Sequence, residues 1–237
     1  MSERPNESAT TDDFEFNALR EANNYRRALL KTFAPHLRGR VIEIGAGHGQ
    51  FTEQLRTVPA INYLLAVEPD AKFCAEFRKA LPTQHLVEGI ITSITDPGPW
   101  NGILSVNVLE HIREDQDELK IYSSMLKKEH GRLCLFVPAR QEIYAPIEID
   151  FGHHRRYSRD DLRRKLETAG FKIVELHYFN FIGYFAWWFS FKMMGQRKFN
   201  PGMVRLFDRV IFPVGFGLES TLTWPPFGQS LVAIAEA

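Results

Sequence analysis

An acidic residue and three glycines stand together directly after an apolar, β-branched run. Residues 41–44 read Val-Ile-Glu-Ile, and Gly45, Gly47 and Gly49 follow at once. A strand, a glycine turn and the start of a helix present bare backbone N–H groups that bind polar ligands. Glycine also lets the backbone adopt a positive φ and approach a ligand closely. The pattern therefore predicts a ligand-binding turn over residues 45–49.

The spacing of these glycines argues against a dinucleotide. The dinucleotide fingerprint G-x-G-x-x-G would place its third glycine at Gln50, whereas the third glycine here is Gly49. Glu43 lies two residues before Gly45, where its carboxylate would repel a diphosphate and attract a cationic or amino-bearing ligand. We therefore expect a positively charged ligand rather than NAD.

Further polar residues follow two other predicted strands. Glu68 ends the strand 62–67, where a carboxylate can accept both hydroxyls of a ribose or stabilise the next helix through its macrodipole. Asn107 and His111 belong to the run Ser-Val-Asn-Val-Leu-Glu-His-Ile over residues 105–112. We expect these three side chains on one solvated rim, with Glu68 contributing little to packing.

A basic, histidine-rich segment follows the fifth predicted strand and reads Gly-His-His-Arg-Arg-Tyr over residues 152–157. Such a run predicts a polar segment outside the core, either a solvated turn or part of an acceptor site. Arg155 and Arg156 would lower the pKa of a neighbouring imidazole by like charge and would suit an acidic acceptor such as a carboxylate or a sugar phosphate. An imidazole that is neutral at pH 7 can serve as a general base. We expect a histidine base, with His153 and His154 ahead of His111.

Strands alternate with helices along the chain. Strands are predicted at 41–44, 62–67, 85–87, 102–106, 132–137, 171–178 and 230–235, and helices over 14–37, directly after Asp70, around 114–127 and over 159–169. This alternation predicts an α/β fold, with a doubly wound, seven-stranded, mostly parallel sheet covered by helices on both faces. Such sheets bind ligands at the carboxyl ends of their strands, which is where the polar residues above lie.

We interpret residues 14–237 as one domain that follows a disordered tail over 1–13. Residues 14–38 form an N-terminal helical lid, and residues 180–226 form an insertion that caps the substrate side before the last strand. Residues 179–191 read FNFIGYFAWWFSF, which is shorter than the roughly 20 apolar residues of a membrane-spanning helix. This aromatic run leaves three interpretations open: a buried helix, the wall of an apolar substrate pocket, or a segment at a membrane surface.

The composition narrows the classes of protein. The formal net charge is zero, which argues against a nucleic-acid surface. Cys74 and Cys134 are the two cysteines of the sequence. They suggest neither a disulfide framework nor a metal site, and they favour a reducing cytoplasm. We expect a cytoplasmic enzyme without a metal, monomeric or homodimeric, that touches a membrane at most peripherally.

The motifs resemble those of one enzyme family. The run from Glu43 to Gly49 resembles the first motif of the class I S-adenosylmethionine (SAM) methyltransferases, E/D-x-G-x-G-x-G, and residues 107–111 resemble the fourth-strand motif N-V-L-E-H of members that act on small molecules. The G-H-x-R-R-Y pattern, together with Asn23-Asn24-Tyr25 and residues 179–183, resembles a bacterial subgroup of the type 11/12 methyltransferases. The subgroup usually carries Asp where this chain has Glu148.

This resemblance, which covers about residues 16–235, implies a Rossmann-like methyltransferase fold with SAM as the cofactor. The implied cofactor-binding residues are Tyr25, Glu43, Gly45, Ala46, Gly47, Gly49, Phe51, Glu68, Pro69, Gly89, Ile90, Ile91, Asn107, Val108 and His111. The implied substrate-binding residues are Tyr144, Glu148, Arg155, Arg156, Tyr157, Tyr184, Trp187 and Trp188.

The resemblance also implies an activity. Members of the subgroup are often encoded among glycosyltransferase or secondary-metabolite genes, so we expect methyl transfer to a small molecule or to a lipid- or carrier-linked sugar, at an oxygen atom. Two alternatives stay open. One is N-methylation of an amine metabolite or a phospholipid headgroup, and the other is a SAM-binding protein that uses the cofactor without transferring its methyl group.

Overall fold

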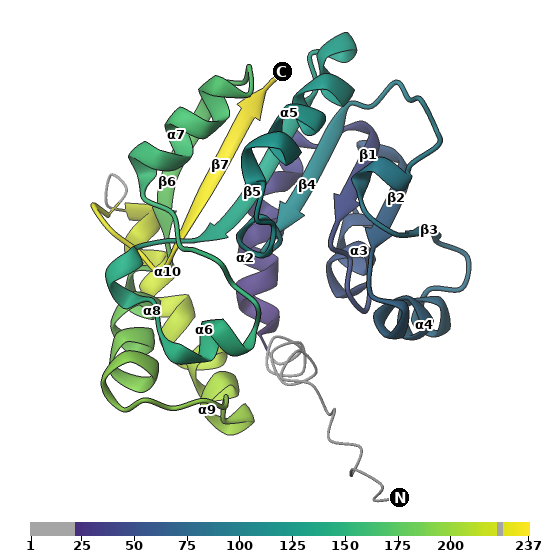
Figure 1. The fold of residues 1–237 in the computed structure, drawn as a ribbon. Helices are drawn as coiled ribbons and strands as arrows, with labels where there is room; N and C mark the ends of the chain where they lie inside the picture. The colour runs from purple at the N-terminus through teal and green to yellow at the C-terminus, as the bar shows by residue number, and fades with distance from the viewer. Residues whose placement is uncertain (1–21, 222–224) are drawn as a thin grey trace, which may run out of the picture.

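A twisted sheet runs through the molecule, with helices on both of its faces (Figure 1). The computed structural model describes residues 22–221 and 225–237. The strands are β1 (Gly39–Ile44), β2 (Ile61–Glu68), β3 (His85–Glu88), β4 (Gly102–Val106), β5 (Arg132–Pro138), β6 (Lys172–Phe179) and β7 (Ser230–Glu236). They are ordered β3-β2-β1-β4-β5-β7-β6, and β7 alone runs antiparallel to its neighbours. The predicted seven-stranded, mostly parallel α/β sheet is confirmed.

Alternating residues of the buried strands supply two apolar layers. Ile42 and Ile44 point to the face that is covered by α5 (Asp115–Leu126) and α7 (Arg159–Thr168). Val41 points to the opposite face, which is covered by α2 (Asn23–Phe33), α3 (Gln50–Leu55) and part of the insertion. Because both faces are buried, the strands read as continuous apolar runs, as is usual for parallel sheets.

The remaining helices lie around the sheet. The helix α4 (Ala71–Ala80) follows β2, and the short α6 (Pro146–Asp150) follows β5. Between β6 and β7 the chain forms α8 (Phe181–Trp187), the π-helical segment η6 (Trp188–Met193), α9 (Pro201–Leu206), the π-helical segment η7 (Phe207–Ile211) and α10 (Phe212–Thr221). The predicted helical insertion is therefore present over its described part.

The insertion is joined to the N-terminal helix through a buried carboxylate. Asp208 of η7 accepts hydrogen bonds from the backbone N–H groups of Asn24 and Tyr25, at 3.0 and 2.9 Å. These N–H groups belong to the first turn of α2, where backbone donors lack partners within the helix. The bonds fix α2 over the sheet. The predicted tail over 1–13 and the start of the predicted lid lie outside the described residues.

Among the described residues, no helix has the length and apolar character needed to cross a bilayer.

Candidate active site

A cavity of about 340 Å³ opens at the carboxyl ends of the central strands. It lies where the strand order reverses, between β1 and β4, which is where open α/β sheets bind their ligands. The ends of β1, β2 and β4 and the loops that follow them form its floor and sides, and Tyr25, Arg26 and Leu29 of α2 close it on one side. Its volume falls within the range of small-ligand pockets.

Glu68, at the end of β2, holds the glycine turn in place. Its Oε2 accepts a hydrogen bond from the Gly47 N–H at 2.8 Å, and its Oε1 accepts one from the Asp70 N–H at 2.9 Å. The side chain is 5% exposed, so the prediction of a loosely packed carboxylate on a solvated rim is wrong. Burial raises the pKa of Glu68, and the two backbone N–H groups oppose that rise. Glu68 also lines the cavity, where a carboxylate can accept further hydrogen bonds from a ligand.

Glu43, in β1, places a second buried carboxyl group in the cavity wall. The Thr52 hydroxyl donates a hydrogen bond to Oε2 of Glu43 at 2.5 Å. Burial raises the pKa of Glu43 to about 8, the Thr52 hydroxyl opposes this rise, and the nearby Glu68 adds to it. Near pH 7 this carboxyl group holds a proton in the ligand-free chain and would release it beside a cationic ligand.

The turn after β1 leaves no room for a side chain. Gly45 has a φ of +72°, and a Cβ built there would lie 2.3 Å from a methyl carbon of Val108. Asn107, which also lines the cavity, has a φ of +52°. Asparagine is one of the few residues besides glycine that adopts this left-handed conformation readily. The turn therefore packs directly against the loop after β4, and both positions need a residue that tolerates a positive φ.

The structure brings most of the predicted cofactor residues to this cavity. Those in its wall are Tyr25, Glu43, Gly45, Ala46, Phe51, Glu68, Pro69, Asn107, Val108 and His111. Gly47 contributes by donating to Glu68, as described above. Gly49 is instead the N-cap of α3, and Gly89, Ile90 and Ile91 do not line the cavity. Ile91 is buried in the core and Ile90 is exposed. A cofactor contact at these three residues stays a prediction.

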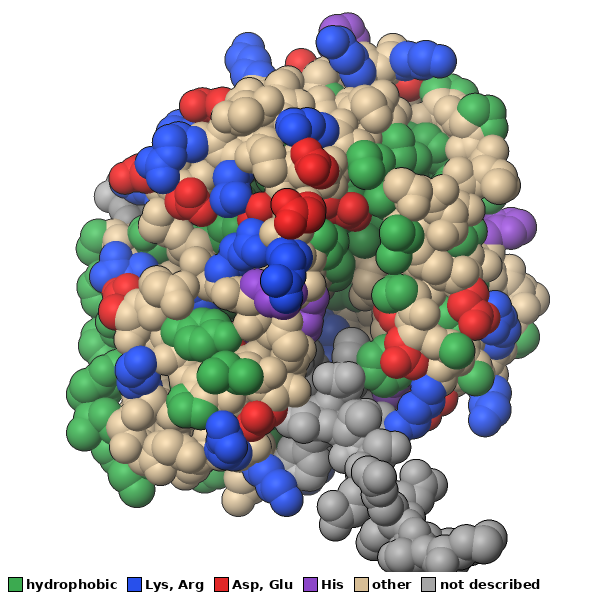
Figure 2. Space-filling view, viewed as in Figure 1, with side chains coloured by type: hydrophobic (Ala, Val, Ile, Leu, Met, Phe, Trp, Pro, Cys, Tyr) green, Lys and Arg blue, Asp and Glu red, His purple; other side chains and the backbone are tan. Residues whose placement is uncertain are grey.

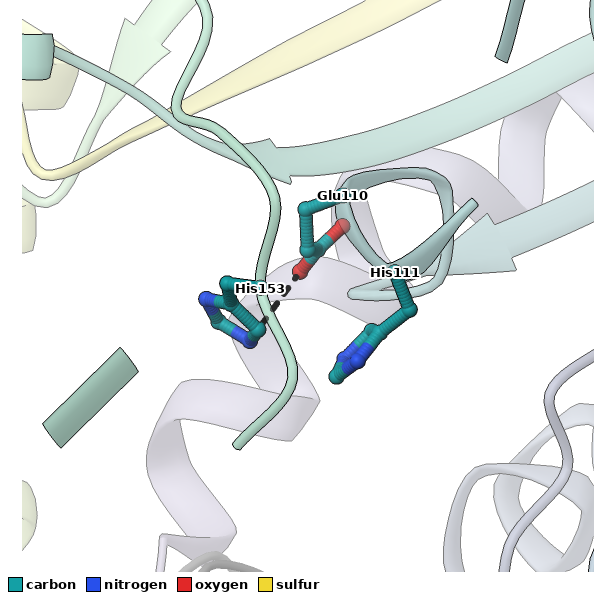
Figure 3. A group of neighbouring side chains, drawn as sticks. All are labelled: Glu110, His111 and His153. Atoms are coloured by element: carbon teal, nitrogen blue, oxygen red, sulfur yellow. Dashed lines mark ion pairs between the residues drawn. The ribbon is translucent and has the colours of Figure 1, made fainter. Parts of the chain in front are cut away.

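Of the three candidate histidine bases, His111 lines the cavity and His153 and His154 do not. The rings of His111 and His153 meet edge to face, with their centroids 4.6 Å apart, and Glu110 lies beside them (Figure 3). His154 is exposed, and its backbone N–H donates to the Glu110 carbonyl oxygen at 2.9 Å. In the space-filling view, histidine and basic side chains gather beside the hollow at the centre of this face (Figure 2). The geometry thus reverses the predicted order of the histidines, and a base role for any of them stays a prediction.

The environment of His111 favours the neutral imidazole. Desolvation by the surrounding chain holds the pKa of His111 below its usual range, and the nearby rings of His153 and His154 lower it further. A hydrogen bond to the Phe151 backbone opposes this shift, and part of the residue still faces the solvent.

The rest of the histidine-rich segment forms buried ion pairs. The Nε of Arg156 donates to both carboxylate oxygens of Glu148, at 2.8 and 2.9 Å. The Tyr157 hydroxyl donates to Oδ2 of Asp115 at 2.9 Å, and Arg155 pairs with the same oxygen at 2.7 Å. Arg156 is 6% exposed and Tyr157 is fully buried, so the prediction of a segment outside the core is wrong for these two side chains. Each arginine is thus paired with a carboxylate.

The aromatic run over residues 179–191 divides between the core and the surface. Trp187 and Phe191 are buried in a small cluster with Phe151, which lines the cavity. Trp188 is 41% exposed. The structure does not bring the other predicted substrate residues into the cavity wall either, and these are Tyr144, Glu148, Arg155, Arg156, Tyr157 and Tyr184. Their contact with an acceptor stays a prediction.

Comparison with known families decides the class of protein. A family model described as a methyltransferase domain matches residues 17–176. The chain belongs to the methyltransferase domain family. It is a class I methyltransferase, and its cofactor is S-adenosylmethionine. None of the curated proteins matches the chain.

Solved structures of this methyltransferase fold match the chain over nearly its whole length. A SAM-dependent methyltransferase from Archaeoglobus fulgidus is 18% identical, with a TM-score of 0.58, and the match covers 95% of this chain and 97% of that one. One from Mesorhizobium loti is 16% identical, with a TM-score of 0.61 and coverages of 92% and 99%. A putative sarcosine dimethylglycine methyltransferase from Galdieria sulphuraria is 12% identical, with a TM-score of 0.62 and coverages of 95% and 97%. At these identities the likeness shows the fold.

The residues of the cavity fit the methyltransferase cofactor. Glu68 offers its carboxylate at the end of β2, which suits the hydroxyls of a ribose. The buried Glu43 suits the cationic amino-acid half, and Gly45 and Ala46 place the backbone of the turn in the cavity wall. Asn107 and His111 line the same cavity, in the segment after β4.

Sequence reasoning missed several side chains of the methyltransferase cavity. They are Arg26, Leu29, Ile44, His48, Gln50, Asp70, Phe73, Val106 and Phe151. Two of them had a signal: Asp70 follows Glu68-Pro69 directly, and Phe151 directly precedes the Gly-His-His run. Glu110 was also passed over, although it adjoins His111, because nothing in the sequence shows that its carboxyl group is buried.

Proposed function

We propose that this methyltransferase transfers the methyl group of SAM to an oxygen atom of a small-molecule or a lipid- or carrier-linked sugar acceptor. The observation that carries the proposal is the group formed by Glu110, His111 and His153. One member, His111, lines the cavity, so the group lies beside it. Nitrogen and carboxylate groups at such a place can hold a hydroxyl and draw off its proton. An amine acceptor would not need such a group once it had lost its proton to water.

The cofactor supplies an activated methyl group on a sulfonium centre, so the chain has to position the acceptor rather than form a covalent bond to it. The acceptor atom must be held about 3–3.5 Å from the methyl carbon. Phe151 and the ring of His111 in the cavity wall supply shape and exclude water. Tyr25 of α2 also lines the cavity, which supports the predicted role of this helix as part of a lid.

The surface of the insertion favours an acceptor linked to a lipid. Large apolar side chains stand exposed along it, namely Phe185, Trp188, Phe189, Met193, Met194, Met203, Leu206, Val210, Ile211, Val214 and Leu218. Its described acidic residues, Asp208 and Glu219, are buried, whereas Lys192, Arg197, Lys198, Arg205 and Arg209 are exposed. Hydrophobic side chains run down the left edge of Figure 2, on the side of the insertion. An apolar surface with basic side chains suits an anionic bilayer.

This surface supports peripheral contact with a membrane. The proposal puts that contact on the cytoplasmic side, in polysaccharide or secondary-metabolite biosynthesis. The free, buried thiols of Cys74 and Cys134 fit a reducing compartment. The chain would then act on the headgroup of its acceptor while the lipid stays in the bilayer.

The test is incubation of the full chain with methyl-labelled SAM and cell extract separated into soluble and membrane fractions. We expect label in a lipid-extractable product of the membrane fraction, bound through an ether that resists mild base. Label on nitrogen would favour the N-methyltransferase alternative. Release of methylthioadenosine without incorporation would favour a reaction that uses the cofactor's aminobutyryl arm.

A further inference from the structure

We propose that Glu110, His111 and His153 bind one divalent transition-metal ion in the wall of the cofactor cavity. The possible ligand atoms of these side chains all lie within 4.8 Å of one another. Figure 3 shows the three side chains directed toward a shared space between the turn at residues 109–111 and the segment before α7. The sequence predicted no metal, because one pair of adjacent residues and a distant histidine form no recognisable ligand spacing.

The carboxyl group of Glu148, beside Nδ1, fixes the orientation of the His153 ring. Its Nδ1 lies 3.3 Å from Oε1 of Glu148. Arg156 and the Ala145 N–H both donate to the Glu148 carboxyl group, the latter at 2.9 Å, and its Oε1 lies where it can accept a hydrogen bond from Nδ1–H of His153. The tautomer that results carries its lone pair on Nε2. Metal-binding histidines are held in this way, by a carboxylate on the ring nitrogen that does not bind the metal.

The lone pair of His153 points at a second carboxylate. Nε2 is buried and makes no hydrogen bond among the described residues, and it lies 4.0 Å from Oε1 of the fully buried Glu110. A ring nitrogen and a carboxylate oxygen that face each other in this way are donor types that first-row divalent ions bind. The gap exceeds the 2.7–3.2 Å of an N–H···O bond. An ion about 2.0–2.2 Å from each atom would span it.

His111 supplies the third possible ligand atom. Because it lines the cavity, it connects the proposed metal site to the cavity. One of its ring nitrogens is engaged by the Phe151 backbone, which leaves the other for a ligand bond. Two imidazoles and one carboxylate suit first-row ions such as Zn²⁺, Fe²⁺ or Mn²⁺ better than Mg²⁺ or Ca²⁺, which prefer sites built from oxygen ligands. Three protein ligands beside a cavity also leave coordination positions for an exogenous oxygen atom.

The ion's role rests on the proposed O-methyltransferase function. An acceptor hydroxyl bound to the ion loses its proton to water more readily, because the positive charge stabilises the alkoxide. The oxygen then forms a bond to the methyl carbon as the S–CH₃ bond of SAM breaks, which releases S-adenosylhomocysteine. No group is oxidised or reduced. His111 acts here as a ligand, and the ion takes the place of the histidine base predicted from the sequence.

The test is a calorimetric titration of the full chain with Zn²⁺, after removal of any affinity tag and treatment with EDTA. A parallel titration with Co²⁺ is followed by visible absorption. We expect one ion per chain. We expect His153→Ala and Glu110→Gln each to weaken binding at least tenfold, and Glu148→Gln to weaken it by about 10–100-fold. The matched control is His154→Ala, which removes the adjacent, exposed imidazole and should leave metal affinity unchanged.

Binding of S-adenosylhomocysteine, measured in parallel, shows that each variant is folded, and His153→Ala should leave it unchanged. Zinc affinity that survives both His153→Ala and Glu110→Gln, or the lack of stoichiometric binding, would overturn the metal site. Methyl transfer that EDTA does not affect would overturn the ion's role and leave the methyltransferase function standing. Stoichiometric zinc with no methyl transfer to any fraction would overturn the proposed function instead, and the metal site would stand.

Discussion

Replacing Glu68 by glutamine is expected to weaken cofactor binding without unfolding the chain. The wild-type carboxylate accepts from the Gly47 and Asp70 N–H groups on its two oxygens. Glutamine keeps one acceptor oxygen but turns an NH₂ group toward the other donor, so one buried N–H loses its partner. The charged acceptor for the ribose hydroxyls is lost as well. Each such loss costs about 1–3 kcal/mol.

For S-adenosylhomocysteine this cost corresponds to a rise in Kd of roughly 5- to 150-fold, measured by isothermal titration calorimetry at pH 7.5. The free energy of unfolding in urea should fall by about 1–3 kcal/mol for the orphaned donor. Glu88→Gln is the matched control, because Glu88 pairs with Glu68 in the β2–β3 register but binds the exposed Arg78 and does not line the cavity. An unchanged Kd for Glu68→Gln, or an equal loss for Glu88→Gln, would refute this reasoning.

Four further outcomes are expected. Gly45→Val should abolish binding of S-adenosylhomocysteine in calorimetry, because its side chain would collide with Val108 in the cavity wall. Retained affinity would contradict the tight packing of this turn. Burial raises the folded-state pKa of Glu43 to about 8, so between about pH 5 and 8 the folded chain holds a proton that the unfolded chain has released. The free energy of unfolding in urea should therefore fall as the pH rises from about 5 to 8. Glu43→Gln should make this fall less steep. Arg156→Ala should lower the free energy of unfolding by about 3–5 kcal/mol, because it leaves the buried Glu148 carboxylate unpaired; a smaller loss than 1 kcal/mol would contradict the buried pair. Phe189→Asp should reduce sedimentation of the chain with anionic vesicles relative to wild type; equal sedimentation would argue against the insertion as the lipid-binding surface.

The part of the site that could be predicted from the sequence is built from local segments. The turn after β1 is encoded by consecutive residues, an apolar strand followed by Gly45 and Gly47, so its conformation and its place at the sheet edge follow from the sequence alone. Glu68 ends β2 and Asn107 directly follows β4, the strands on either side of β1, and the reversal of strand order brings such ends together. These residues meet in one cavity as predicted.

The part that could not be predicted depends on contacts between distant residues. The histidine-rich segment has the composition of a solvated turn, yet Arg156 and Tyr157 are buried because Glu148 and Asp115 balance and bind them. Pairing of this kind is set by the tertiary fold and leaves no periodicity in the sequence. The position of His153 beside Glu110 has the same origin, since more than forty residues, which include α5, β5 and α6, separate them along the chain.

The central claim is that the glycine turn and Glu68 hold SAM at the end of the sheet. A crystal structure of the full chain with S-adenosylhomocysteine tests this most directly. We predict that the ribose hydroxyls lie within hydrogen-bond distance of the Glu68 carboxylate and that the amino-acid half passes over Gly45 toward Asn107. A ligand bound outside this cavity, or one whose ribose does not contact Glu68, would contradict the account.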